Sequence, residues 1–315
     1  GTTVSSTARG PSMSGNLLKP ELGAPGASVS AEVATGTERS PFGGTSGASP
    51  MVAGSAALLL QDCRRRDREG PGRGRGKALG RGAGAKGLPA AADRTPACGP
   101  PVLKALLMNS AFRDVVSDTT GALAEITRIG AGEVRVDAAA AATMVARGAA
   151  DGQPKLGLGF LDLSRRAFLR RTVEIENRGR SVLFLEVEPT FRLPAKAATG
   201  AVRAFTRSLM VVPPGRSRQL PIYFRIDPEA LTGSFLTSGT GGADPANLSA
   251  MEYDGYLTLT DRRSGEQVAL PWHVLPRRAA EVVAHDQALP ASGGAIGLRN
   301  LGAGTAQNDA YTIVA

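Results

Sequence analysis

One serine, Ser46, stands among small residues in the stretch Gly-Thr-Ser-Gly-Ala-Ser-Pro (residues 44–50), directly before an apolar run of helical composition. A serine hydroxyl attacks a carbonyl carbon when a base removes its proton, a fixed geometry aims it, and donors receive the oxyanion. At the N-terminal end of a helix, the amide of Ser46 and the helix dipole would face that developing charge. Serine is also a preferred helix N-cap, and capping is a far commoner role than catalysis. Spacing alone therefore leaves Ser46 open as a nucleophile or as a cap.

A base for Ser46 has few candidates, because the chain holds two histidines, His273 and His285, and both follow the serine. His273 is most simply a strand residue, and His285 lies in a stretch between domains. A set of Ser46, a later aspartate and His273 would follow the chain order of α/β-hydrolases, whose elbow is Gly-x-Ser-x-Gly. Position 48 is alanine, however, and residues 37–44 do not form a buried strand pattern. The sequence therefore disfavours an α/β-hydrolase.

The elements that would position Ser46 are predominantly helical. Residues 49–63 are apolar almost all round, which predicts a helix buried inside a sizeable domain. A second helix is predicted over residues 100–111, with proline in its first turn. Residues 1 to about 40 read as short extended pieces joined by Gly-Pro, Lys-Pro and Pro-Gly turns. Glycines around the serine permit close approach, and Gly47 in particular is expected to leave room beside Ser46.

The pattern changes past residue 150, where apolar and polar residues alternate. Segments such as Arg-Thr-Val-Glu-Ile-Glu (residues 171–176) are separated by Asn-Arg-Gly, Pro-Gly and Ser-Gly turn signals. Period-two patterning at this spacing predicts an antiparallel β-sandwich over residues of about 155–280. The residues that follow begin another β-like unit.

The net charge of +9 is concentrated in residues 64–100, which hold ten Lys or Arg and three Asp or Glu. This segment is rich in Gly, Pro and Arg, so we expect a disordered basic insertion. It lacks the aromatic residues on which nucleic acids stack, so nucleic acid is not an expected partner. The two cysteines, Cys63 and Cys98, flank it, and a disulfide and a pair of free thiols both remain open. Metal binding is poorly supported, because no histidine lies nearby.

No stretch has the pattern of a signal peptide, and no apolar run approaches membrane-spanning length. The first residue is glycine. We therefore expect a piece of a longer protein, of open oligomeric state.

Residues 44–54, Gly-Thr-Ser-Gly-Ala-Ser-Pro-Met-Val-Ala-Gly, resemble the serine signature of the subtilisin-like serine proteases, the subtilase family. The family commonly has methionine after the serine, where this chain has Gly47. Residues 5–31 resemble the run that leads to the catalytic serine, and residues 100–111 the helix that follows it. The alternating region resembles the fibronectin-III-like domain that follows the protease in larger secreted subtilases.

The resemblance implies an α/β fold, with a mostly parallel sheet and buried helices, over residues 1–150. It further implies an all-β fibronectin-III-like sandwich over residues 151–282 and the start of a truncated β-rich unit over residues 283–315. It makes the protein a serine endopeptidase that acts through an acyl-enzyme on Ser46. The family's order is Asp, His, Ser, and the residues before Ser46 hold neither partner. Asn16 is not assigned as the oxyanion asparagine.

We therefore expect this chain to be inactive by itself. The alternative is a non-catalytic, degenerate subtilase scaffold or a cell-surface binding module. The implied partner is a protein or peptide substrate, at an extracellular or cell-surface location. No cofactor is visible, and the calcium found in the family cannot be placed on this sequence.

Overall fold

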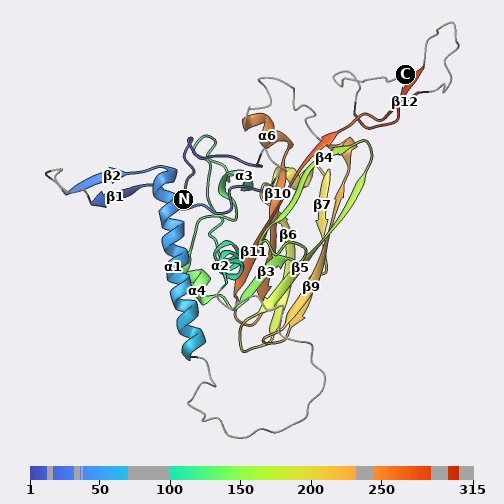
Figure 1. Ribbon diagram of the computed structural model, residues 1–315. Helices are drawn as coiled ribbons and strands as arrows, with labels where there is room; N and C mark the ends of the chain where they lie inside the picture. The colour runs from blue at the N-terminus through green and yellow to red at the C-terminus, as the bar shows by residue number, and fades with distance from the viewer. Residues whose placement is uncertain are drawn as a thin grey trace, which may run out of the picture.

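The computed structural model describes residues 1–12, 17–31, 36, 38–69, 99–231, 245–284 and 297–304. Helices and sheets are both present, with substantial β content, as the sequence predicts (Figure 1). A long helix, α1 (Thr45–Glu69), stands along one side of the molecule, and two sheets lie on the other (Figure 1). Three shorter helices come between them in the chain: α2 (Pro100–Asn109), α3 (Ile126–Ile129) and α4 (Val136–Ala141).

The two sheets make up residues 144–278, which we call the two-sheet unit. One sheet has five strands in the order β4-β11-β10-β6-β8, and the other has four in the order β3-β5-β9-β7. All neighbours are antiparallel except β4 and β11. The strands are β3 (Met144–Gly148), β4 (Leu156–Leu163), β5 (Ala167–Asn177), β6 (Leu183–Phe191), β7 (Val202–Phe205), β8 (Leu209–Val212), β9 (Ser217–Ile226), β10 (Tyr253–Asp261) and β11 (Gln267–Arg278). The helical turns of this unit are α5 (Pro194–Ala198), η1 (Pro228–Ala230) and α6 (Pro245–Met251).

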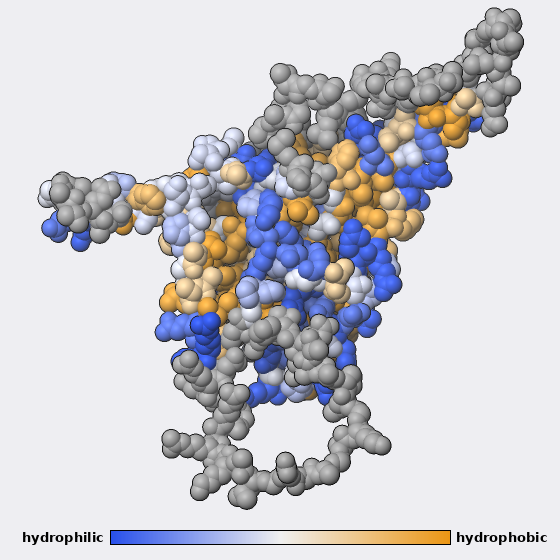
Figure 2. Space-filling view, viewed as in Figure 1, coloured by the Kyte–Doolittle hydropathy of each residue, from blue (hydrophilic) through white to orange (hydrophobic). Residues whose placement is uncertain are grey.

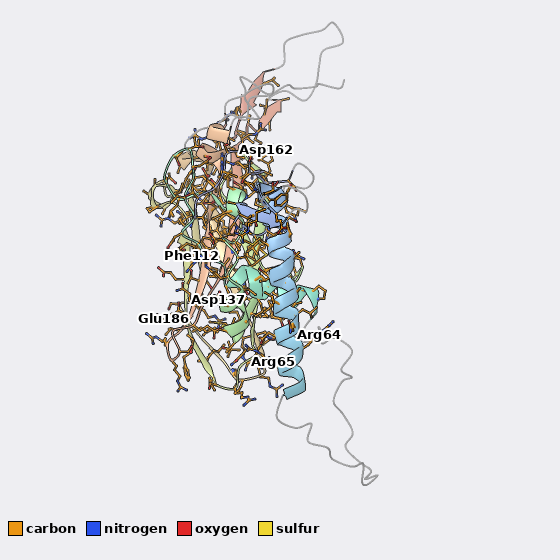
Figure 3. All side chains as sticks on the ribbon, turned by 90° about the vertical axis from the view of Figure 1, so that its left-hand side faces the viewer. Arg64, Arg65, Phe112, Asp137, Asp162 and Glu186 are labelled. Atoms are coloured by element: carbon orange, nitrogen blue, oxygen red, sulfur yellow. The ribbon has the colours of Figure 1, made fainter. Side chains whose placement is uncertain are left out.

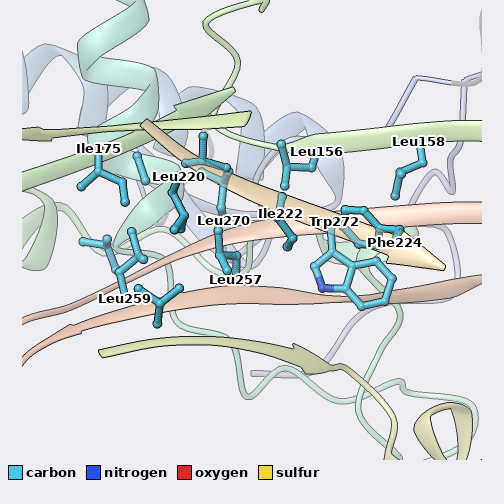
Figure 4. Packing of buried hydrophobic residues seen from close by; sticks show 14 of the residues in the cluster. Leu156, Leu158, Ile175, Leu220, Ile222, Phe224, Leu257, Leu259, Leu270 and Trp272 are labelled. Atoms are coloured by element: carbon cyan, nitrogen blue, oxygen red, sulfur yellow. The ribbon is translucent and has the colours of Figure 1, made fainter. Parts of the chain in front are cut away.

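One apolar core joins the two sheets (Figure 4). Successive side chains of a strand point to opposite faces, so the alternation read from the sequence places one apolar set inward. On β9 this set is Ile222, Phe224 and their neighbours, which face Leu257, Leu270 and Trp272 of the other sheet. The sheet pairing begins with β3, which pairs with β5. The β-rich unit thus starts a few residues before the boundary expected at residue 151.

The predicted parallel sheet is not formed by residues 1–142 within the described ranges. The strands β1 (Ser28–Ala31) and β2 (Arg39–Phe42) make an antiparallel pair. Parallel pairing there is limited to isolated bridges, such as Thr2 with Val116 and Gly23 with Glu133. Prolines interrupt the extended pieces, and a proline has no amide hydrogen with which to continue a ladder.

Helix α1 is not the buried helix that its composition predicts. Leu59 and Cys63 are buried against α2 and α4, whereas Met51 and Leu58 are 42% and 58% exposed. Apolar side chains accordingly gather on the molecular surface over this helix (Figure 2). An apolar composition indicates what a helix can bury, but it does not fix how many faces are covered.

The helix also extends further than expected, through residues 64–69 of the basic segment. Asp62 pairs with Arg65 and with Arg66, each at 2.7 Å, three and four residues along the helix. Such pairs support helix formation. Figure 3 shows Arg64 and Arg65 on the lower part of α1. Residues 70–98 of the predicted insertion lie outside the described residues.

Two short strands, β12 (Val282–Ala284) and β13 (Leu298–Asn300), pair antiparallel near the segment in which a further unit is expected. This pair is tied to the two-sheet unit by Glu281, whose carboxylate accepts hydrogen bonds from Ser164 and Arg165. Across the described ranges, we find no helix with both the length and the apolar character to cross a bilayer.

Candidate active site

Helix α1 begins after a glycine in the left-handed conformation, and Ser46 lies inside its first turn. Gly44 has a φ of 79°, and its carbonyl accepts the N–H groups of Gly47 at 3.0 Å and Ala48 at 3.2 Å. Gly44 is therefore the N-cap, Thr45 the first helical residue and Ser46 the second. Glycine adopts a positive φ without steric strain, which explains its presence there. The N-cap of this helix is therefore Gly44, and Ser46 does not have the capping role that the sequence left open.

Ser46 presents both a hydroxyl and an amide at this helix end. The residue is exposed, and its N–H belongs to the first turn, where helical amides have no acceptor within the helix. The helix has 25 residues and no acidic residue in its first turn, so no carboxylate there offsets the positive end of its dipole. In the described part of the chain, the hydroxyl makes no hydrogen bond. This arrangement can donate to an oxyanion, but it contains no base.

Glycines bring the turn at residues 25–26 into contact with the start of α1. A Cβ on Gly47 would lie 2.5 Å from the carbonyl oxygen of Gly26, and a Cβ on Gly26 would lie 2.7 Å from that of Gly44. Both distances are shorter than van der Waals contact. The space beside Gly47, which the sequence suggests as room next to the nucleophile, is therefore filled by Gly26. The same contact explains why this position holds glycine.

A cavity of about 450 Å³ lies beside the same turn. Gly43, Gly44 and Thr45 line one side of it, and residues 1–4 and 23–27 line much of the rest. Arg128 also reaches this cavity, and its Nη1 is buried without a hydrogen-bond partner. Ser46 is not among the lining residues, so the cavity is a neighbour of the serine and not its immediate surroundings.

His273 lies in β11, as expected, and cannot serve Ser46 as a base. Its side chain is 1% exposed, and its Nε2 lies 3.2 Å from Oε2 of Glu252, which is also 1% exposed. Thr127 and Arg9 bind the same carboxylate. A histidine enclosed in this way cannot exchange a proton with a substrate at the surface. His285 and Asn16 lie outside the described residues.

The contacts of His273 belong to a buried polar cluster that sequence analysis did not identify; we call Arg9, Thr127, Glu252, Asp254 and His273 the Glu252 cluster. It joins the first residues of the chain and α3 to β10 and β11. Burial would raise the pKa of Glu252, but the hydrogen bond with His273 and the charge of Arg9 hold that pKa below its ordinary value. Asp254 accepts the N–H of Ile126 at 2.6 Å.

Burial and the charge of Glu252 raise the pKa of Asp254 to about 7. The carboxyl groups of this cluster are inaccessible to substrate, so we assign it a structural role. Its contacts connect residues 1–132 to the two-sheet unit. The one signal in the sequence was the pair of carboxylates, Glu252 and Asp254, at the start of a predicted strand.

Cys63 is 8% exposed and disulfide-bonded. The chain's other cysteine, Cys98, lies outside the described residues. Among the side chains that the structure describes, no group of three or more His, Cys, Asp or Glu is placed to hold a metal ion.

Solved structures similar to this chain include the FixG-related protein from Vibrio parahaemolyticus, with 14% identity over 42% of this chain and 94% of that one, at a TM-score of 0.26. The CooA pilin subunit from enterotoxigenic Escherichia coli shares 13% identity over 43% of this chain and 98% of its own, at a TM-score of 0.27. A PapD-like domain of human CEP192 shares 10% identity over 43% and 84%, at a TM-score of 0.24. Scores this low carry no argument about fold or function.

No curated protein matches the chain. The family model described as the subtilase family matches residues 1–132, the part that contains Ser46 and the start of α1. This match supports a subtilase domain in residues 1–132, and thus a protease at the level of the family.

Proposed function

We propose that the protein is a subtilisin-like serine endopeptidase in which Ser46 is the nucleophile. The observation that carries the proposal is the position of Ser46: it is exposed in the first turn of a long helix, within the residues that match the subtilase family. The amides at this helix end have no intrahelical acceptor, and we assign the amide of Ser46 to the oxyanion hole.

The reaction proceeds by acyl transfer. The Oγ of Ser46 bonds to the peptide carbonyl carbon while a base takes the hydroxyl proton, and the negative charge moves to the carbonyl oxygen. The C–N bond then breaks, the amine leaves with the proton, and an acyl-enzyme remains. Water attacks this ester, which releases the carboxylic acid and restores the hydroxyl.

The base is the missing component. His273 is enclosed in the Glu252 cluster, and no other histidine belongs to the described residues. Without a triad, about 10⁴- to 10⁶-fold of rate would be lost. We therefore expect the 315-residue chain by itself to hydrolyse no peptide at a measurable rate. Peptide hydrolysis by the isolated chain that Ser46→Ala abolishes would contradict this expectation.

The remaining assignments rest on the resemblance and on the two packed sheets. We assign residues 1–150, apart from strand β3, to the C-terminal part of the catalytic domain. Strand β3 joins residues 151–282 in a fibronectin-III-like sandwich, and residues 283–315 are the start of a further unit. An extracellular or cell-surface location and a protein or peptide substrate follow from the same family. The alternative is a non-catalytic, degenerate subtilase scaffold or a cell-surface binding module, in which the two-sheet unit does the binding.

Hydrolysis assays on the protein purified from its native cell distinguish these functions. We expect it to cleave a denatured protein substrate, and we expect Ser46→Ala to abolish cleavage. Ser49→Ala, three residues along the same helix, is the matched control and should leave cleavage within about twofold, since that hydroxyl is given no role. A folded native protein that cleaves nothing, or that keeps its activity after Ser46→Ala, would support the degenerate scaffold.

A further inference from the structure

Around the pairing of β7 with β9, the outer face of the four-stranded sheet carries arginines and aromatic rings side by side. The acidic residues of this face on β5, Glu174 and Glu176, lie at the other end of the sheet, beside Arg147. The sequence neighbours of the arginines and rings, such as Leu169 and Phe224, point into the core, so alternation turns the arginines and rings outward. We call them the aromatic–arginine face: Phe168 and Arg170 on β5, Arg203 and Phe205 on β7, and Tyr223 and Arg225 on β9. In Figure 1, β7 and β9 lie on the opposite side of the molecule from α1.

The strand register concentrates positive charge at one place on this face. Arg203 lies directly opposite Arg225 in the pairing of β7 with β9. Like charges directly opposite each other on neighbouring strands are destabilising. Asp227 follows two residues later, but its carboxylate is paired with Arg166 at 2.6 Å. The register therefore places two arginines opposite each other. The pKa of Asp227 is lowered mainly by Arg166 and also by the charge of Arg225, so Asp227 balances only part of the positive charge here.

The guanidiniums of this face are also free of competing contacts. Among the described residues, those of Arg170, Arg203 and Arg225 make no hydrogen bond or ion pair, and the Nε of Arg225 is buried without a partner. A ligand with carboxylates would therefore break no existing bond in order to bind. Guanidinium and carboxylate groups match in geometry and can form two parallel hydrogen bonds.

The stacking of two aromatic rings makes this face less suited to nucleobases than to carboxylates. Phe205 and Tyr223 stack on each other, with ring centroids 5.6 Å apart and an angle of 17° between the planes. Each ring thus has one face covered, although the residues remain 48% and 39% exposed. Nucleobases bind to sheets by stacking on open ring faces, whereas ring edges carry the positive end of the quadrupole and suit carboxylates. Phe168, 68% exposed, adds one apolar contact.

We propose that the aromatic–arginine face binds an acidic polypeptide segment, whose Asp or Glu side chains pair with Arg170, Arg203 and Arg225. This inference does not depend on the proposed function, because the face belongs to the two-sheet unit and not to residues 1–132. The outermost position of β7 in the sheet suits an extended segment. Binding of an acidic segment would give the two-sheet unit a recognition role that is separate from the chemistry of Ser46.

Fluorescence anisotropy with a labelled poly-glutamate peptide tests the proposal on the 315-residue chain. We expect saturable binding that weakens as salt is added, and an affinity about tenfold lower in the double variant Arg203→Gln/Arg225→Gln. The matched control is Arg216→Gln/Arg218→Gln, which removes the same charge from exposed arginines at the other end of β9. That control should change the affinity less than about threefold.

Three results would overturn the proposal: no binding by the folded chain, equal losses in the two double variants, or tighter binding of single-stranded DNA than of poly-glutamate. Because Arg225 packs against the sheet, the single variant Arg203→Glu provides a second test at an exposed position. It should abolish poly-glutamate binding without lowering the thermal unfolding midpoint, because a glutamate opposite Arg225 replaces a like-charge pair with an opposite-charge pair. Unchanged binding by a folded Arg203→Glu would also contradict the proposal.

Discussion

The start of α1 and the two-sheet unit differ in the kind of sequence signal that they carry. At the start of α1, a short motif lies within the residues that match the subtilase family model, yet this end of the helix is largely exposed, and its first turn packs against Gly26. In the two-sheet unit no single motif is specific, yet alternation over many residues builds a continuous core. The first region carries chemical information and the second carries most of the packing. A few residues can therefore indicate the chemistry of a site, whereas the stability of a domain depends on the packing of many residues.

The largest effect we expect comes from the core of the two-sheet unit. Trp272 is fully buried and packs edge-on against Phe191, with ring centroids 5.1 Å apart. Trp272→Ala should lower the free energy of unfolding by about 3–5 kcal/mol, measured by urea denaturation. Leu58→Ala on α1 is the comparison, and it should change that free energy by less than about 1 kcal/mol because Leu58 is exposed. Equal losses of unfolding free energy in the two variants would contradict the view that the two-sheet unit carries most of the packing.

The next effect concerns pH at the joint between the regions. Asp254 has a pKa of about 7 in the folded protein, above the ordinary value of 3.8. The folded state therefore binds this proton more tightly. The associated stability is complete below about pH 4, is lost as pH rises to about 7, and then stays constant. Over the two pH units from 7 to 5, the free energy of unfolding should rise by about 2 kcal/mol from this group.

Asp254→Asn should flatten that rise, because asparagine can still accept the N–H of Ile126 but does not titrate. Glu252 has a lowered pKa, so its own contribution falls at lower pH, outside this window. The measurement is urea denaturation at pH 5, 6 and 7 for both proteins. Identical pH profiles would mean that Asp254 is not a buried, titrating carboxyl.

A smaller effect tests the glycine contact that supports Ser46. Gly47→Ala would place a Cβ 2.5 Å from the carbonyl oxygen of Gly26, so the free energy of unfolding should fall by about 1–3 kcal/mol. Gly54→Ala is the matched control on the same helix, since a Cβ there meets nothing within 4 Å. It should stabilise the helix by about 0.5–1 kcal/mol. The same sign for both substitutions would show that Gly26 does not approach α1 closely.

The sequence predicted those features that depend on local pattern. The alternation past residue 150 predicted the strands, and the motif around Ser46 predicted a helix start. What it missed depends on contacts between distant segments. The exposure of α1 depends on which elements cover it, and the Glu252 cluster joins Arg9 to residues more than two hundred positions away. The role of Gly47 likewise depends on Gly26, whose approach no local pattern encodes.

The central claim is that Ser46 is an activated nucleophile, and covalent labelling tests it most directly. The protein purified from its native cell is treated with a fluorophosphonate probe, and its peptides are analysed by mass spectrometry. We predict one adduct, on the hydroxyl of Ser46, which disappears in Ser46→Ala and persists in Ser49→Ala. An adduct that survives Ser46→Ala, or a folded native protein that remains unlabelled, would contradict the claim.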